Sequence, residues 1–173
     1  MITQLESERL VLRQWRASDI DWFAELYADP VPSAHVGGPR TLAQAWRQMA
    51  AFAGIWSLRG FGKFVLETKA DKRGIGHCGL WHPADFPEIE LGWGLLATEH
   101  GKGYATEAAQ RVKAHAFEDR DLPTLVSFVA PDNLPSRRVA ERLGGKAEPT
   151  REILGKQAIV YRYAKLTGTG SIK

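Results

Sequence analysis

The sequence has one cysteine, no long apolar run and little excess of either charge. The single thiol, Cys78, excludes an intrachain disulfide and a cysteine-based zinc site. The apolar stretches are interrupted by Arg, Lys or Glu well short of the roughly 18 residues that a membrane helix needs. The opening stretch, MITQLESERL, lacks the apolar core of a secretory signal. These absences predict a cytoplasmic protein that does not bind membranes.

The charge balance gives little sign of a polymeric anion as a partner. The chain has 23 Lys+Arg against 20 Asp+Glu, a net charge of +3, and its cations are scattered. Nucleic-acid binders usually gather cations in a patch. The small excess suits a phosphate-bearing small molecule at least as well, so we expect no direct nucleic-acid binding. The five histidines show no metal-ligand spacing, and we predict no metal.

Length and composition predict one globular domain. The chain has 173 residues, of which 44% are hydrophobic and 25% are charged, both close to globular averages. No linker or repeat divides it. We expect a single domain over residues 1–166 and a flexible tail over 167–173, TGTGSIK.

The hydrophobic pattern predicts a mixed α/β fold. Alternating apolar residues predict seven strands, over 9–15, 64–68, 75–81, 89–96, 125–129, 147–154 and 157–165. Helical spacing predicts helices that begin near Ser18 and Thr41, a helix over 103–118, and a short helix that ends at Gly144. The order of elements indicates a mostly antiparallel central sheet of about seven strands, flanked by helices.

Two helix starts carry capping patterns. Ser18 with Asp21, and Thr41 with Gln44, each place a hydroxyl three residues before a group that can bond back to the cap. Both patterns predict the first residue of a helix.

One face of the strand 89–96 is unusual. Glu90, Gly92, Gly94 and Leu96 share that face. Glycine weakens a strand interior, so two on one face predict either a bulge or a backbone that another group approaches closely.

A glycine-rich turn follows this strand and opens the helix 103–118. Residues 101–105, GKGYA, place consecutive N–H groups at the positive end of the helix, an arrangement that binds phosphate. The alternative is a glycine turn that only allows the helix to start. A Walker loop is excluded because Gly103, not Ser or Thr, follows Lys102. A dinucleotide fingerprint is excluded because Thr106 stands where the third glycine is required.

The segment HGKGYA (100–105) closely resembles the acyl-CoA diphosphate loop of the GNAT N-acetyltransferase superfamily. IELGWGLL (89–96) resembles the family's fourth strand, and NLPS (133–136) resembles its N-x-x-S helix. ERLVLRQWRASDID (8–21) resembles the branch that acetylates the N-termini of ribosomal proteins. The resemblance implies that acetyl-CoA is bound by Leu95, Leu96, His100, Gly101, Lys102, Gly103, Tyr104, Ala105, Asn133 and Ser136.

Two positions depart from the family pattern. His100 stands where Arg or Gln is usual, and Gly145 replaces a Phe that commonly follows the glycine at the end of the helix. The first change removes one diphosphate contact at most, since most contacts there are backbone. The second removes a core aromatic, so the packing around it must differ. Tyr104 is interpreted as a packing residue rather than as an acid.

The resemblance implies direct transfer of acetyl from acetyl-CoA to a primary amine. Backbone N–H groups near Leu95 or Leu96 would stabilise the oxyanion. Asn133 would contact the pantetheine arm, and Ser136 would hydrogen-bond the departing thiolate. On local grounds alone, Pro131 and Pro135 favour an Asx-turn or a helix cap for Asn133, and Ser136 is equally a capping residue.

Three carboxylates are candidates for the base that deprotonates the amine. Glu90 is the first candidate, because it lies on the glycine face of the strand 89–96; Glu88 and Glu152 follow. The alternative for each is a carboxylate in water or in an ion pair. Lys102, Arg137 and Arg138 are either phosphate contacts or solvated cations.

The acceptor is a protein N-terminal α-amine or a small-molecule amine, and the protein a monomer or homodimer. Two other functions stay open: a non-catalytic CoA-binding regulatory or interaction module, and a basic ribosome- or nucleic-acid-binding protein.

Overall fold

The structure is a computed structural model that describes residues 4–28 and 30–165. The predicted tail, 167–173, lies outside these residues. The described strands are β1 (Leu5–Glu6), β2 (Leu10–Arg13), β3 (Lys63–Thr68), β4 (Gly74–Trp81), β5 (Glu90–Leu95), β6 (Thr124–Val129), β7 (Lys146–Ala147), β8 (Arg151–Ile153) and β9 (Lys156–Ala164). The α-helices are α1 (Ile20–Ala28), α2 (Pro30–Ser33), α3 (Leu42–Arg59), α4 (Tyr104–Ala114) and α5 (Leu134–Arg142).

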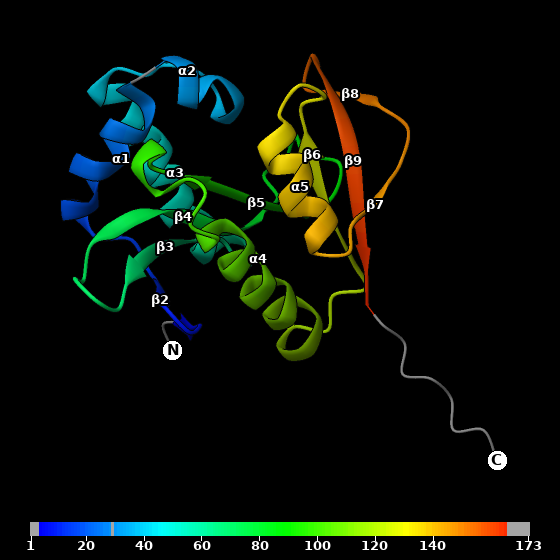
Figure 1. Ribbon diagram of the computed structural model, residues 1–173, viewed down its shortest axis with the longest axis horizontal. Helices are drawn as coiled ribbons and strands as arrows, with labels where there is room; N and C mark the ends of the chain where they lie inside the picture. Colours follow the sequence, from blue (N-terminus) through cyan, green and yellow to red (C-terminus); the bar gives the residue numbers. More distant parts are fainter. Residues whose placement is uncertain (1–3, 29, 166–173) are drawn as a thin grey trace.

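These strands form one mixed sheet, as predicted (Figure 1). The described residues contain nine strands in the order β1-β2-β3-β4-β5-β6-β9-β7, with β8 paired to β9. All pairings are antiparallel except that of β5 with β6. The predicted strand 147–154 is divided into β7 and β8, because Pro149 between them has no N–H to donate to a ladder.

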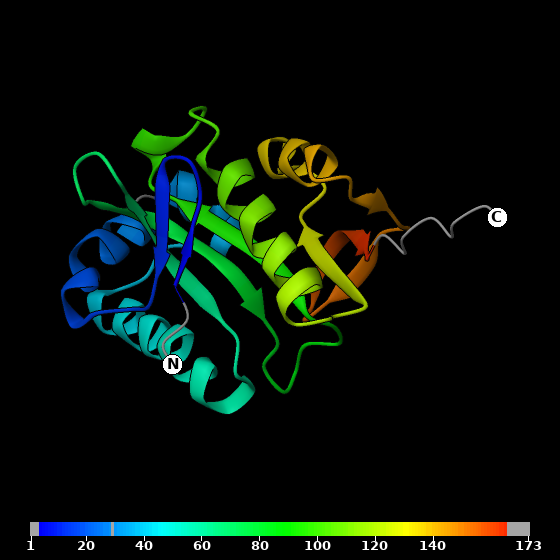
Figure 2. The same cartoon turned by 90° about the horizontal axis from the view of Figure 1, so that it is seen from below.

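Helices cover both faces of the sheet. In Figure 2, α4 lies diagonally across the strands. Ala108, Ala109 and Val112 of α4 are fully buried in the larger core cluster, together with Cys78 of β4. The second cluster joins Phe23 and the rest of the apolar side of α1 to the α3 residues Ala45, Met49 and Phe52. The predicted helix 103–118 consists of α4 followed by a π-helical turn, His115–Asp119.

One capping prediction is confirmed and one is wrong. Thr41 and Gln44 form the expected capping box at the start of α3. Ser18 does not begin α1; it lies within a short 3-10 turn, Ala17–Asp19. The Asp19 carboxylate accepts the backbone N–H of Arg16 at 2.7 Å and two hydrogen bonds from the buried Arg13 guanidinium, at 2.8 and 2.9 Å. A charged, bidentate pair outcompetes a serine hydroxyl for the cap.

The sheet opens between β5 and β6. These parallel strands share one register pair, Glu90 with Val126. The Val126 N–H donates to Ile89 O at 3.1 Å, and the Ser127 hydroxyl donates to Leu91 O. Beyond this point both strands line cavities instead of pairing with each other, so the carboxyl half of β5 has a free edge.

Candidate active site

The turn before α4 has the geometry of an anion site. Gly101 and Gly103 have φ angles of +76° and +84°, which glycine adopts without strain. Gly103 is the N-cap of α4 and supplies no capping side chain. The first N–H groups of a helix have no partner within the helix. They therefore point out of α4 toward the cavity beside the loop.

The turn between β1 and β2 holds this loop in place. Glu107, in the first turn of α4, accepts hydrogen bonds from the Ser7 hydroxyl at 2.7 Å and from Arg9 N and Nε at 2.8 and 2.7 Å. Burial raises the pKa of Glu107, but these bonds outweigh it and lower the pKa overall. Arg9 also donates to Lys102 O at 3.0 Å and lies over the Tyr104 ring. The sequence carries no local signal for this contact.

The two polar side chains of the loop bond to protein groups. The ring of His100 donates from Nε2 to Leu95 O at 3.1 Å, and Lys102 Nζ donates to the buried Glu99 at 3.0 Å. Arg73 binds the same carboxylate at 3.0 Å. His100 and Lys102 thus brace the loop against the end of β5, and the anion-binding groups that remain are backbone N–H groups.

A first cavity of about 580 Å³ lies against this loop. Eight of the ten residues that the resemblance assigns to acetyl-CoA line it: Leu95, His100, Gly101, Gly103, Tyr104, Ala105, Asn133 and Ser136. Leu96 and Lys102 do not. The Leu96 N–H donates to Ile75 O at 3.0 Å, and its side chain is buried between the sheet and α1. The Leu96 N–H is therefore not free to stabilise an oxyanion.

The start of α5 forms the opposite wall. Asn133 is the N-cap of α5, and its Oδ1 accepts the backbone N–H of Ser136 at 3.2 Å. Among the described residues, none accepts a hydrogen bond from Ser136 Oγ or from the Asn133 side-chain amide. Asn133 is thus a helix cap, and its amide donor and the Ser136 hydroxyl both remain available to a ligand.

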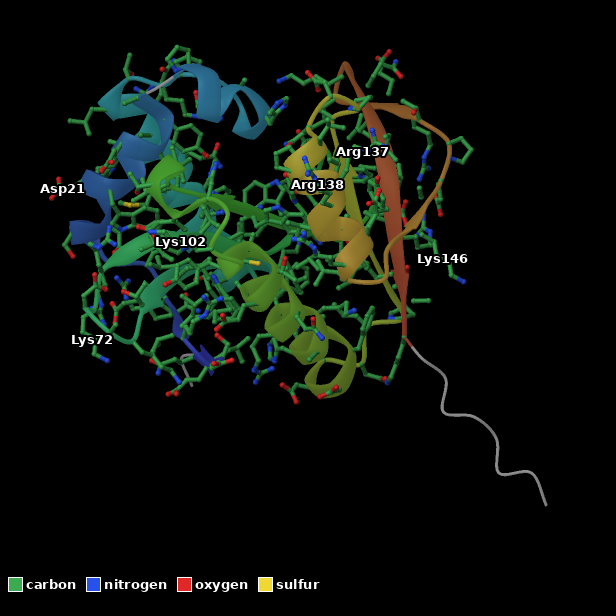
Figure 3. The ribbon with its side chains drawn as sticks, in the orientation of Figure 1. Asp21, Lys72, Lys102, Arg137, Arg138 and Lys146 are labelled. Carbon is green, nitrogen blue, oxygen red and sulfur yellow. The ribbon has the colours of Figure 1, made fainter. Side chains whose placement is uncertain are left out.

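The neighbouring cations differ in position. Figure 3 labels Arg137 and Arg138 on α5, and Lys102 in the loop before α4. Arg138 lines the first cavity, whereas Arg137 donates to Tyr161 Oη at 3.3 Å and to Pro131 O at 3.2 Å. Arg142 also lines the first cavity. Of the three cations considered from the sequence, only Arg138 borders the space for a phosphate.

A second cavity, of about 730 Å³, lies on the α3 side of the sheet. It is walled by aromatic rings, among them Tyr27, Phe52, Trp81, Phe86 and Phe128. The two cavities share four lining residues: His35, Trp93, Asn133 and Ser136. They therefore meet at the free edge of β5, beside the Ser136 hydroxyl.

Glu90 lies on the floor of the second cavity. Burial raises the pKa of its carboxyl group, while the charge of Lys63 and the backbone N–H of Phe128 act in the opposite direction. A carboxyl whose pKa is raised toward neutrality is a better proton acceptor than an exposed one. Glu88, in contrast, pairs with Arg162 at 2.6 Å, which lowers the pKa of Glu88. Glu152 lines neither cavity.

The two glycines of β5 accommodate side chains of the protein itself. The register of β5 with β4 is unbroken from Glu90 to Leu95, so the predicted bulge is absent there. A Cβ on Gly94 would lie 2.8 Å from His77 Nε2, and a Cβ on Gly92 would lie 2.6 Å from Lys63 Nζ. Close approach, the other expectation, is confirmed. Neither His77 nor Lys63 stood out as a site residue in the sequence, because only the register reveals them.

Gly145 also has a packing reason. A Cβ there would lie 2.9 Å from both Ala140 O and Tyr163 Cε1. The buried rings of Tyr161 and Tyr163 lie beside it. The core aromatic side chains come from β9 at this point, which leaves no room for a larger residue at position 145.

Other candidate chemistries find no support in residues 4–28 and 30–165. Cys78 is buried, and burial raises the pKa of its thiol to about 12, so it is not a nucleophile. No three His, Cys, Asp or Glu side chains in this part of the chain are arranged to hold a metal ion. None of its helices is long and apolar enough to cross a membrane.

The open sheet, the glycine-capped α4 and the paired cavities are those of a GNAT-type N-acetyltransferase. Residues 9–146 match the family described as acetyltransferase (GNAT) domain, and the chain belongs to that family. The family's general reaction is the transfer of acetyl from acetyl-CoA to an amine.

Relatives agree with this assignment. An acetyltransferase structure from Agrobacterium tumefaciens is 39% identical, with a TM-score of 0.88 over 94% of this chain and 95% of that one. An uncharacterized N-acetyltransferase, p20, from Bacillus licheniformis is 29% identical over 83% of each chain. A ribosomal-protein-S5-alanine acetyltransferase from Vibrio fischeri shares the fold, with a TM-score of 0.73 over 95% of this chain and 97% of that one, at 20% identity.

Proposed function

We propose that residues 1–166 form one acetyltransferase domain that moves the acetyl group of acetyl-CoA directly to a primary amine. The observation that carries this proposal is the junction of the two cavities at Trp93, Asn133 and Ser136. One cavity borders a set of free helix N–H groups, and the other contains a carboxyl group. A cofactor and an acceptor bound in them would meet at the junction without a covalent enzyme intermediate.

The first cavity suits the diphosphate and pantetheine of acetyl-CoA. The N–H groups of the loop and of the first turn of α4 would bind the diphosphate, and Arg138 would add a charge at its rim. The free edge of β5 at Gly94 and Leu95 and the side-chain amide of Asn133 would bind the pantetheine amides. Leu96 is left out of this set because its N–H already has an acceptor.

The second cavity would take the acceptor amine, with Glu90 as the base. The neutral amine attacks the thioester carbonyl, the nitrogen–carbon bond forms, and the carbon–sulfur bond breaks. Glu90 would receive the proton of the amine, and the Ser136 hydroxyl would donate a hydrogen bond to the departing thiolate. A thiolate whose thiol has a pKa of about 8.5 is a good leaving group, so Ser136 should contribute less to the rate than Glu90.

The acceptor is an α-amine of a protein N-terminus or a small-molecule amine. An α-amine of pKa about 8 is roughly one-tenth neutral at pH 7, whereas a lysine amine of pKa about 10.4 is under about one-thousandth neutral. The α-amine therefore needs little help from a base, whereas the lysine amine needs much more. Glu90 therefore favours an α-amine or another amine of low pKa.

The test is thiol release from acetyl-CoA in the presence of peptides with free N-termini and of small amines. We expect release that depends on the amine and an acetylated product detected by mass spectrometry. Saturable acetyl-CoA binding without release for any amine would overturn the proposal and leave a non-catalytic CoA-binding module.

A further inference from the structure

Lys63 carries a buried ammonium group whose charge acts on Glu90 without forming an ion pair with it. The residue is 6% exposed, at the start of β3, and it lines the second cavity. Its Nζ lies 5.4 Å from the centre of the Phe52 ring. It forms no ion pair and donates no hydrogen bond within the part of the chain that the structure describes. A buried cation is normally paired, so this one requires an explanation.

The fold is built to bring this group to the cavity floor. Lys63 is opposite Gly79 in β4, and Gly79 is opposite Gly92 in β5. The two glycines leave the sheet surface bare along this row, and the Lys63 side chain lies across it as far as Gly92. The Lys63 carbonyl accepts hydrogen bonds from the indoles of Trp15 at 2.8 Å and Trp56 at 3.1 Å, which fixes the backbone from which the side chain extends.

A carboxyl group faces the same point from the other side. A Cβ on Gly92 would lie 2.6 Å from Lys63 Nζ and 3.4 Å from Glu90 Oε2, yet the two groups form no ion pair. The remaining ionisable groups that line this cavity are Tyr27, His35, Arg40, His77, Asp85 and Lys156. Burial lowers the pKa of His77 well below its usual value, which keeps the ring neutral, and raises the pKa of Tyr27 to about 12.

This pair of groups constrains the acceptor. An amine that enters beside Lys63 is repelled while it is protonated, and the burial of Lys63 strengthens this repulsion. An anionic group on the same acceptor would remove the repulsion by pairing with Lys63. The amine would then face Glu90, on the side of the junction with the first cavity.

We propose that the acceptor is a primary amine with a carboxylate a few atoms away, and that Lys63 binds this carboxylate. The inference rests on the proposed function and makes it more specific. The carboxylate is either that of a free α-amino acid or the side chain of an acidic first residue in a peptide. Lys63 is thus a specificity-determining residue, while Glu90 and Ser136 act on the reacting groups.

The experiment compares matched ligands with matched variants. Binding to the CoA-loaded protein is measured by calorimetry for N-acetyl-aspartate and for its diamide, which differ only in charge. Thiol release is measured for aspartate, alanine, their amides, and peptides that begin with Asp or Asn. The variants are Lys63→Met, which keeps the length of the side chain, and Gly92→Ala, whose methyl group displaces the ammonium. Lys146→Met is the control, since Lys146 is exposed at β7 and lines neither cavity (Figure 3).

We expect wild type and Lys146→Met to prefer the carboxylate over the amide by at least about tenfold, and both site variants to lose that preference. Comparing thiol release for free aspartate and alanine with thiol release for the Asp-peptide shows whether the carboxylate is that of a free amino acid or the side chain of the first residue in a peptide. Equal use of carboxylate and amide by wild type, binding of neither ligand, or an unchanged preference in folded Lys63→Met would each overturn the inference. Loss of all acetyl transfer by a protein that still binds CoA would instead refute the proposed function, and the binding comparison would still decide the role of Lys63.

Discussion

The imidazole of His77 lies directly against Gly94, so that a Cβ on Gly94 would be 2.8 Å from His77 Nε2. The two residues are register partners in β4 and β5. The ring is 2% exposed, and neither of its nitrogens has a hydrogen-bond partner among the described residues. The glycine at position 94 is therefore required by the core of the protein itself, next to the edge that we assign to acetyl-CoA.

The two glycines of β5 should respond differently to alanine. His77 is packed against Phe23 and Phe52 and cannot yield, so Gly94→Ala should lower the free energy of unfolding by about 1–3 kcal/mol. At Gly92 the new methyl group meets the far end of the flexible Lys63 side chain at 2.6 Å and touches the Glu90 carboxyl at 3.4 Å, and the cost should be below about 1 kcal/mol. Urea unfolding measures both values. Equal losses would show that His77 moves as freely as the lysine end.

The anion site should be sensitive to charge at Gly103. Asp and Asn have the same shape and both tolerate positive φ, so the pair Gly103→Asp and Gly103→Asn separates charge from backbone strain. We expect Gly103→Asp to weaken acetyl-CoA binding at least about tenfold more than Gly103→Asn, because the carboxylate would face the diphosphate. Calorimetric titration measures the difference. Similar affinities for the two variants would remove the loop assignment.

Glu90 should act only while it is ionised. Burial raises its pKa above the usual 4.5, so the wild-type rate should rise with pH through that raised pKa. Glu90→Gln should lose this rise. The loss of rate should be largest between the pKa of Glu90 and that of the amine, and it should shrink at higher pH, where the amine is already neutral. A small loss that is independent of pH would return Glu90 to a structural role.

The same raised pKa has a consequence for stability. A carboxyl group whose pKa is higher in the folded than in the unfolded protein costs stability once it ionises, and the cost grows as pH rises from about 4.5 through the raised pKa. Glu90→Gln does not ionise, so it should be more stable than wild type at neutral pH, and the advantage should vanish in acid. Thermal melts across this range measure it. A less stable variant at pH 7 would mean that attraction to Lys63 outweighs burial.

Ser136 should affect the rate more than the structure. Its backbone N–H, not its hydroxyl, completes the cap of α5, so Ser136→Ala keeps the cap. We expect a fall in kcat of about tenfold with little change in acetyl-CoA affinity, since the leaving thiolate needs little help. Ser57→Ala, on the exposed side of α3, is the matched control. Equal losses in kcat and in affinity would make Ser136 a structural residue.

Local signals in the sequence account for much of the fold. The capping box at Thr41, the left-handed glycines before α4 and the N-cap at Asn133 are set by neighbours a few residues apart, and the structure contains each of them. The capping pattern at Ser18 predicts the start of α1 wrongly, because the Asp19 cap depends on Arg13, which lies on β2. A capping pattern shows which groups lie near the start of a helix, but not which of them forms the capping hydrogen bond.

The acceptor side of the site depended on strand register. Gly92 and Gly94 signalled a close approach, yet the groups that approach them, Lys63 and His77, come from β3 and β4. The register between strands is set by the packing of whole sheet faces, so no short segment of the sequence predicts it. The contact of Arg9 with Glu107 is likewise not predictable from a short segment, since the packing of the sheet against α4 brings these residues together.

The most direct test is calorimetric titration of the purified protein with acetyl-CoA, beside NAD and ATP as controls. We expect saturable, one-to-one binding of acetyl-CoA and no binding of the other two nucleotides. A folded protein that does not bind acetyl-CoA, or that binds all three alike, would contradict the assignment of the first cavity.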